Sequence, residues 1–296
     1  MKKDLFSILC LALFTILLFI KNAFIKKVII SSCSLFFYHI FPSLFPFMIL
    51  SDLFLYFHVP EYLSLFLSPF MSKLFSISPY GCYVFFLSCF SGTPTNAYTL
   101  TNLVIDKKMS HEEAAHVLSF SFFSNPLFLY SAYSSFLPAN IVFPILIIPY
   151  LTNIIIAFIF RPKSYNKQFS FSKSISNFGA FFSLSLHKTM NTLVFILGSI
   201  VFFAMISSII NPFDFTLVKG ILEISQGLYS LNRIPSLFLR EVLALLFTSF
   251  GGMCIHMQVK GIISEAGISY LPFLKARFCQ VGLSITLLLI FHYAFF

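Results

Sequence analysis

The chain has 296 residues, of which 58% are hydrophobic and 10% are charged. Soluble domains carry about 25% charged residues, so this composition excludes a soluble globular protein. The formal net charge is +9, but Lys and Arg stand in short segments between long apolar runs, which is the pattern of membrane proteins rather than of nucleic-acid binders. The sequence therefore predicts an all-α polytopic membrane protein with one membrane domain.

The N-terminal region, 1–60, predicts two apolar helices. Two lysines followed by the apolar segment 5–20 resemble a signal peptide, but no small-residue cleavage site follows, so we expect a retained first helix. The second helix is expected over 28–56, where two prolines kink or start it. Asp52 lies near the inner end of this helix, and we expect it to cap the helix or to reach water.

An uncharged stretch at 79–106 predicts a re-entrant hairpin within a first repeat, 61–160. Its arms, 81–90 and 96–105, are mostly apolar, and ten helical residues rise about 15 Å, half of a hydrocarbon core of roughly 30 Å. Between the arms lie poor helix formers, since glycine costs entropy and proline lacks a backbone donor. A kinked spanning helix without a ligand is the alternative. The tip comprises Ser91, Gly92, Thr93, Pro94, Thr95 and Asn96.

Two further elements belong to this repeat. Segment 61–75 has one polar stripe, which suits a helix in the membrane interface, and 111–137 predicts a broken helix that begins with a capping box of Ser110 and Glu113. A proline inside it removes a backbone bond and pushes the preceding residue out of the helical region. A plain spanning helix is expected over 141–160. The break comprises Ser124, Asn125 and Pro126.

A second repeat, 176–296, follows a basic loop, 161–175, which we expect in the cytoplasm. The expected elements are an interfacial helix at 171–188, spanning helices at 192–210 and 278–293, a hairpin at 214–233 and a broken helix at 241–260. Charged residues are expected in the connections, among them Arg233, Arg240, Glu241, Lys275 and Arg277.

Polar residues and glycines interrupt the second hairpin and the second broken helix, as in the first repeat. The interruptions comprise Glu223, Ser225 and Gln226 in the hairpin, and Gly251 and Gly252 in the helix. Counting spans from a cytoplasmic N-terminus places the two hairpins on opposite sides of the membrane. Inverted repeats with paired broken helices are typical of secondary transporters, which bind substrate near the bilayer midplane. The sequence therefore predicts a substrate site built from both hairpin tips and both breaks.

The first tip suits an anion. A half-helix that begins near Thr95 points free N–H groups and the positive end of its dipole at the tip. The hydroxyls of Ser91 and Thr93 add donors, although such hydroxyls also bond their own preceding turn. Glu223 is expected to bind a coupling proton or cation, because an acid within a span is costly; a surface loop residue is the alternative. His256 is either a core residue or a proton relay.

Several motifs together resemble one known family. They are S-G-T-P-T-N-A-Y, H-E-E-A-A, S-N-P-L-F, G-I-L-E-I-S-Q-G and F-G-G-M-C-I-H-M-Q-V. Over nearly its whole length the chain resembles the YlbJ-type sporulation integral membrane proteins, which carry a Gate domain similar to the concentrative nucleoside transporters. The family includes the stage V sporulation protein that moves dipicolinate across the outer forespore membrane. Thr93 departs from the family, which usually has an aromatic residue there.

The resemblance implies a bacterial membrane transporter for a small organic anion, with dipicolinate as the expected substrate and the outer forespore membrane as the expected location. A nucleoside-type permease of the same fold and a non-transporting scaffold for spore assembly are the alternatives. The expected partners are the substrate, a coupling proton or sodium, the lipid bilayer and a second copy in a homo-oligomer, but no nucleic acid. The sequence holds no catalytic constellation or metal motif, so we expect neither an enzyme nor a cofactor.

Overall fold

The computed structural model describes residues 2–60, 62, 71, 73–161, 177–211 and 213–295 of the chain. These residues form helices joined by turns, without a strand. Within the described residues, 5 helices are long and apolar enough to cross a membrane. They are Asn22–Tyr56, Ala139–Ile159, Phe178–Ile210, Leu237–Ser264 and Leu271–Ala294. This confirms the prediction of an all-α polytopic membrane protein.

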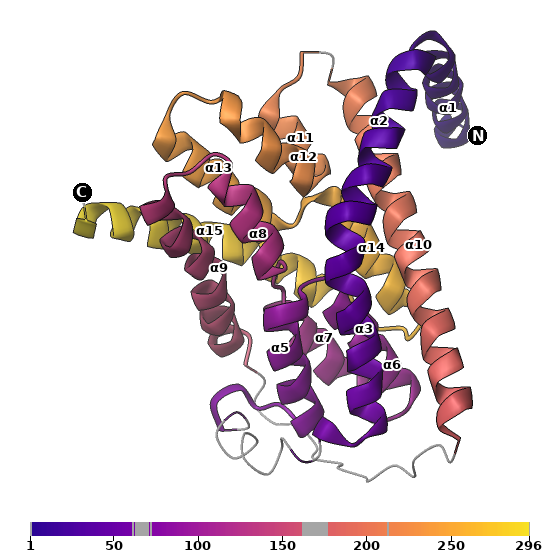
Figure 1. Ribbon diagram of the computed structural model, residues 1–296, viewed down its shortest axis with the longest axis vertical. Coiled ribbons are helices and arrows are strands. Elements are labelled where there is room, and N and C mark those ends of the chain that lie inside the picture. Colours follow the sequence, from indigo (N-terminus) through magenta and orange to yellow (C-terminus); the bar gives the residue numbers. More distant parts are fainter. Residues whose placement is uncertain are drawn as a thin grey trace.

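The N-terminal region forms a short helix and then one long rod. The elements are α1 (Lys2–Ile20), α2 (Asn22–Leu35), the π-helical turn η1 (Phe36–Ile40) and α3 (Phe41–Tyr56). The rod α2–η1–α3 runs beside α10 (Phe178–Ile210) along the long axis of the molecule (Figure 1). The expected irregularity at the prolines appears as η1, because Pro42 has no N–H for the helical ladder and the preceding turn widens.

The first hairpin and the first broken helix each consist of two helices joined by a non-helical segment, while re-entry of the hairpin into the membrane stays a prediction. The elements are α5 (Pro79–Ser91), α6 (Thr95–Ile105), α7 (His111–Phe120) and α8 (Pro126–Ser134). Ser78 caps α5 by accepting from the Gly81 N–H at 3.2 Å. The capping box forms in part: Ser110 accepts from the Glu113 N–H, but the Glu113 carboxylate accepts from the Ser78 N–H at 2.6 Å. Glu113 thereby joins the starts of the hairpin and of the broken helix.

The second half also contains a short hairpin and an interrupted helix. After α9 (Ala139–Ile159), which closes the first half, its elements are α10, α11 (Thr216–Leu222), α12 (Ile224–Ser230), η2 (Leu231–Arg233), α13 (Leu237–Phe250), α14 (Gly252–Ser264) and α15 (Leu271–Phe295). The α5–α6 hairpin lies toward the lower end of the long axis and the α11–α12 hairpin toward the upper end (Figure 1). This arrangement agrees with hairpins that open to opposite sides, although the inverted repeat itself stays a prediction.

Three expectations about the second half are wrong. The interfacial helix and the spanning helix are one continuous helix of 33 residues, α10, because no proline interrupts 178–210. The last helix, α15, begins at Leu271, so Arg277 lies inside a helix rather than in a connection. Glu241 lies within α13 and is fully buried, and it bonds His292 of α15 at 2.5 Å. The segment 61–75 and the basic loop fall mostly outside the described residues.

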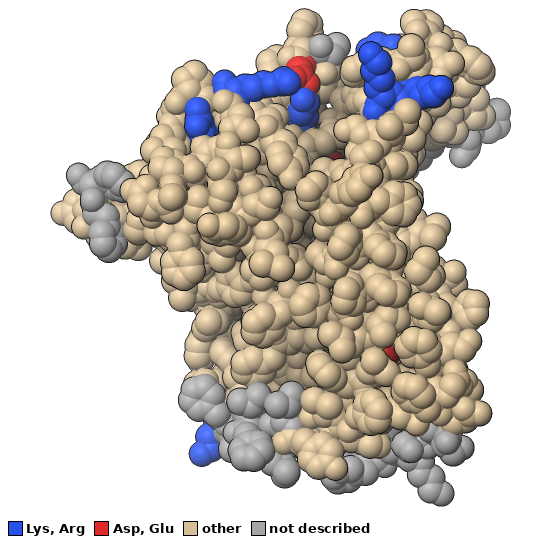
Figure 2. Space-filling model, in the orientation of Figure 1, with Lys and Arg blue, Asp and Glu red and all other residues tan. Residues whose placement is uncertain are grey.

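The surface of the protein suits contact with lipid. Large apolar side chains stand exposed on many helices, such as Phe19 at 79%, Leu127 at 75% and Val194 at 64%. On the face shown in Figure 2, Lys and Arg gather at the upper end, over the α1–α2 turn and the α11–α13 region, and the broad middle is almost free of charge. An exposed apolar band without charge is what the hydrocarbon core of a bilayer requires.

Candidate functional site

The first hairpin tip lies directly against the first break. Gly92 ends α5 with φ 77° and ψ −178°, a conformation that is essentially restricted to glycine. A Cβ at Gly92 would lie 2.6 Å from the Asn125 backbone nitrogen. The Thr93 N–H donates to the Phe123 carbonyl at 2.6 Å, and the Thr93–Pro94 peptide is cis. The sequence motif at 91–96 therefore forms a tip that is held to the segment 121–125.

The three hydroxyl groups of the tip differ in their partners. The Ser91 Oγ donates to the Leu87 carbonyl of its own helix at 3.0 Å, so its hydroxyl is already in use. The Oγ1 atoms of Thr93 and Thr95 are buried and have no hydrogen-bond partner among the described residues. A buried polar group left unpaired costs about 1–3 kcal/mol. The two threonine hydroxyls are the side-chain hydroxyls of this tip that remain available to a ligand.

The two asparagines of this region hold the tip and the break in place. Asn96, fully buried, donates to the Ser121 carbonyl at 2.9 Å. Asn125 caps α8 by accepting from the N–H groups of Leu127 and Phe128, and it donates to the Phe90 carbonyl at 3.3 Å. Ser124 is half-buried beside Asn125, and Pro126 is the first residue of α8. Both amides have protein partners, so they position the site.

The second hairpin turns at Glu223. Its carboxylate is 5% exposed and accepts from the N–H groups of Ser225 at 3.1 Å and Gln226 at 2.9 Å. The alternative of a surface loop residue is therefore wrong. Glu223 is the buried N-cap of α12, and the positive end of the helix dipole there favours a carboxylate. Lys219 pairs instead with Asp214, and this contact lowers the pKa of the exposed Asp214 carboxyl.

Glycines bring the second break against the second hairpin and also against the first break. Gly251 and Gly252 have φ of 96° and 61°, in the left-handed region that favours glycine. A Cβ at Gly252 would lie 3.3 Å from the Gly220 carbonyl oxygen of the second hairpin. A Cβ at Gly251 would lie 2.7 Å from the ring of Phe122 in the first break. The two helix breaks, far apart in the sequence, therefore meet at Phe122 and Gly251.

Helix N-termini at this meeting point are capped in two cases and uncapped in two. Asn125 caps α8 and Glu223 caps α12, as described above. The N-cap residues of α6, Pro94, and of α14, Gly251, make no side-chain cap bond, although Asn96 accepts from the Ala97 N–H in the first turn of α6 at 2.8 Å. Uncapped N–H groups at the positive end of a helix dipole attract anions. The tip of the first hairpin and the second break each supply one such N-terminus.

Arg277 belongs to this region, although the sequence placed it in a connection. Its side chain is 0% exposed, and one guanidinium nitrogen donates to the Ser119 carbonyl at 2.6 Å. The guanidinium carbon lies 4.2 Å from the centroid of the Phe122 ring. The signal in the sequence was the apolar segment after Arg277, which runs to the end of α15.

His256 lies behind the second break with both ring nitrogens engaged. One nitrogen contacts the Tyr270 hydroxyl at 2.5 Å, and the other contacts the Phe250 carbonyl at 2.9 Å. The side chain is 4% exposed and its ring packs on Phe273 at 5.4 Å between centroids. This geometry favours the core histidine over the proton relay.

Asp52 is buried at a helix junction, which corrects the expectation that it caps a helix or reaches water. It is 6% exposed and accepts from Tyr98 at 2.8 Å, Ser185 at 2.6 Å and Asn102 at 3.4 Å. These bonds join α3 to α6 of the first hairpin and to α10. The signal for this site was present in the sequence, since a carboxylate inside an apolar span is costly and needs partners.

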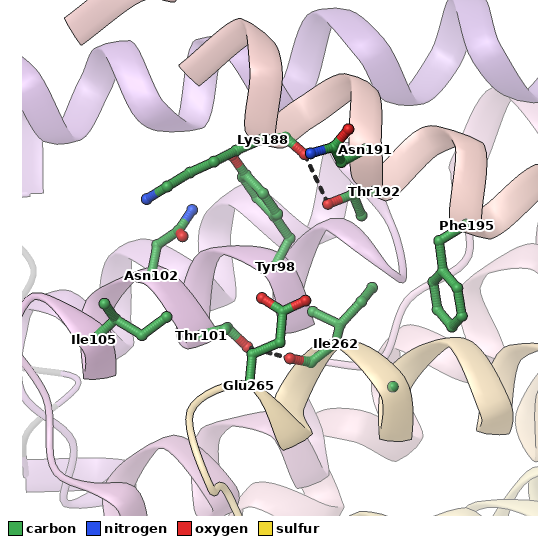
Figure 3. A pocket seen from close by; sticks show the side chains of 11 residues that line it. Tyr98, Thr101, Asn102, Ile105, Lys188, Asn191, Thr192, Phe195, Ile262 and Glu265 are labelled. Atoms are coloured by element: carbon green, nitrogen blue, oxygen red, sulfur yellow. Dashed lines mark hydrogen bonds between the residues drawn. The ribbon is translucent and has the colours of Figure 1, made fainter. Parts of the chain in front are cut away.

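A cavity of about 270 Å³ lies beside this junction, between α6, α10 and α14 (Figure 3). Lys188 extends across it toward Asn102, and the Glu265 carboxylate points into it (Figure 3). Tyr98 and Asn102 line the cavity and also bond Asp52. The residues of the hairpin tips and breaks are not among those that line it. The cavity thus lies along the C-terminal part of α6, away from the hairpin tip, and polar side chains line it.

A known protein is similar to this chain. No protein-family model matches the chain, and no solved structure matches it. The chain is similar to the sporulation integral membrane protein YlbJ of Bacillus subtilis (strain 168). The two are 25% identical over an alignment of 291 residues, and the match covers 81% of this chain and 71% of that protein. This similarity confirms the predicted resemblance of the chain to the YlbJ-type sporulation integral membrane proteins.

Proposed function

We propose that this protein is a secondary transporter that moves a small organic anion across a membrane during spore formation, with dipicolinate as the first candidate substrate. The observation that carries the proposal is the meeting of the two helix breaks, where Phe122 lies against Gly251. Non-helical backbone at membrane depth is tolerated where it is buried in protein or lines a cavity, and transporters use it to bind substrates.

Two features of this meeting point favour an anion. The N-cap residues of α6 and α14 make no side-chain cap bond, so the first N–H groups of each helix, apart from the Ala97 N–H that Asn96 accepts, are available to carboxylate oxygens. The unpaired Oγ1 atoms of Thr93 and Thr95 add hydroxyl donors beside the α6 N-terminus. A dicarboxylate such as dipicolinate has one negative group for each N-terminus. The tips of both hairpins and both breaks form the substrate site in this proposal.

Coupling to a proton or to sodium is part of the proposal. Glu223 and His256 are the carriers that the sequence indicates, but both have fixed protein partners. Asp52 is a third candidate, because its bonds join the first hairpin to α3 and α10. A change in its charge would alter how tightly the hairpin is held, which is what coupling needs.

The proposed location is the outer forespore membrane, and a homo-oligomer is the proposed state. The similarity to a sporulation integral membrane protein supports the first of these. A fluorescent fusion of the full chain in a sporulating host would test the location. Crosslinking in native membranes would test the oligomeric state.

The function is tested with the full chain purified and reconstituted into liposomes. Uptake of radiolabelled dipicolinate is compared with uptake of uridine, with empty liposomes as the control. Saturable uptake of dipicolinate supports the proposal. Uptake of uridine alone would indicate a nucleoside-type permease, and uptake of neither by folded protein would favour a scaffold role.

A further inference from the structure

Arg277 is a buried cation whose hydrogen-bonding capacity is only partly used. It is 0% exposed, and its two terminal nitrogens donate to the Ser119 carbonyl and to the Gln280 side-chain oxygen. Its Nε is buried without a hydrogen-bond partner in the described part of the chain. The guanidinium faces the ring of Phe122 at 4.2 Å and that of Phe273 at 5.2 Å.

No carboxylate in the described residues forms an ion pair with Arg277. Burying an unpaired charge is costly, even after the surroundings relax. Ser119 lies in the last turn of α7, so the negative end of the helix dipole offsets a small part of this cost. The cation–π contact with Phe122 offsets a further part. Neither contact neutralises the charge of Arg277, so a bound anion would stabilise it.

The position of Arg277 connects it with both helix breaks. Ser119 and Phe122 flank the start of the first break, and Phe122 also contacts the second break at Gly251. The Phe122 ring is 1% exposed, and it contacts both the guanidinium and Gly251. The ring therefore covers the guanidinium on the side of the breaks. The charge thus lies one aromatic ring away from the point where the two breaks meet.

We propose that Arg277 binds a carboxylate of the transported anion, and that the Phe122 ring covers the guanidinium until the substrate enters. This inference rests on the proposed transport function and assigns its anion-binding residue. A guanidinium presents two parallel N–H donors to a carboxylate, a geometry that Lys cannot reproduce. When the ring moves aside, the unpaired Nε–H and the neighbouring N–H of Nη2, the nitrogen that also bonds the Ser119 carbonyl, form that pair of donors.

The test uses the full chain purified in lipid nanodiscs and measures dipicolinate binding by isothermal titration calorimetry. A neutral probe, pyridine-2,6-dicarboxamide, has the same ring and shape without the charges. The variants are Arg277→Met, which keeps much of the volume, and Arg277→Lys, which keeps the charge. Lys275→Met is the matched control, because it removes one positive charge from the same helix at an exposed position.

The wild type is expected to bind dipicolinate at least tenfold more tightly than the diamide. Arg277→Met is expected to weaken dipicolinate binding by a factor of ten to a hundred for each charged hydrogen bond lost, and to leave diamide binding unchanged. Arg277→Lys should fall between wild type and Arg277→Met. Lys275→Met should bind both probes as the wild type does.

Two results would overturn the inference in distinguishable ways. A folded wild type that binds neither dipicolinate nor another carboxylate would remove the proposed function itself. If the wild type binds dipicolinate and Arg277→Met binds it with the same affinity and the same preference over the diamide, Arg277 is a structural cation at the end of α7. If Arg277→Met does not fold, Arg277→Lys decides: unchanged affinity and preference in that variant would also overturn the inference.

Discussion

Replacing Gly92 by alanine should separate the first hairpin tip from the first break. At φ 77° and ψ −178° a non-glycine residue costs about 1–3 kcal/mol. The added Cβ would lie 2.6 Å from the Asn125 nitrogen and 3.1 Å from the Asn125 Cα, and backbone atoms cannot give way as a flexible side chain can. Overpacking of this kind costs typically about 1–3 kcal/mol, so the sum is about 2–6 kcal/mol.

The assay is thermal unfolding of the purified protein in detergent, together with hydrogen exchange of peptides that cover 91–98 and 121–128. Gly92→Ala should lower the unfolding temperature and speed exchange in both peptides. Gly198→Ala is the matched control, since a Cβ at Gly198 meets nothing within 4 Å and alanine favours a helix by roughly 0.5–1 kcal/mol. A Gly92→Ala protein that melts at the wild-type temperature, with unchanged exchange at 121–128, would refute the packing described for the tip.

Four further predictions concern the site and the topology. Thr95→Val should raise the apparent substrate constant for dipicolinate uptake about tenfold to a hundredfold, since its unpaired hydroxyl is then lost; an unchanged constant would exclude a contact with substrate. Glu223→Gln should lower stability by about 0.5–2 kcal/mol in a melting assay, as loss of an N-cap does; if it instead flattens the pH or sodium dependence of uptake at full stability, Glu223 carries the coupling ion. Asp52→Asn should change the ion dependence of uptake while dipicolinate still binds, and wild-type ion dependence would rule it out as the coupling group. Cysteines placed in 161–173 and at 213 of a Cys-free chain should be labelled from opposite sides of the membrane, and labelling from one side would remove the inverted-repeat argument.

The sequence predicted the elements whose signal is local. Glycine and proline act on their own backbone and that of their neighbours, so the interruptions at Gly92, Pro126 and Gly251 appear in the structure where they were expected. The sequence also indicated which helices are apolar enough to span a membrane, because that depends on length and composition alone. The sequence divided this region into helices at 171–188 and 192–210, but Lys188 lies inside α10, where its long side chain reaches the cavity beside the helix.

The residues that the sequence misplaced are charged ones whose partners come from distant helices. Asp52 is satisfied by Tyr98 and Ser185, and Glu241 is bonded to His292. Arg277 is held by the carbonyl of Ser119. A charge next to an apolar run looks like the end of that run unless the fold shows a partner, and no local pattern carries that information.

The two hairpins are attached to the rest of the protein by different means. At the first, hydrogen bonds of Asn96 to Ser121 and of Thr93 to Phe123 add to the close packing of Gly92 on Asn125. In the second, glycines alone bring the surfaces together: its two arms meet at Gly220 and Gly227, where a Cβ on Gly227 would collide with the Gly220 Cα, and Gly220 packs on the ring of Phe247 in α13.

Because of this difference in attachment, the two hairpins resist movement in different ways. When the first hairpin moves, water can replace its hydrogen bonds one at a time, so the free energy of the protein rises in small steps. Nothing replaces the close packing of the second hairpin, which gains its stability only at full contact. We therefore expect the second hairpin to keep its place against α13 when hydrogen bonds of the first hairpin are broken.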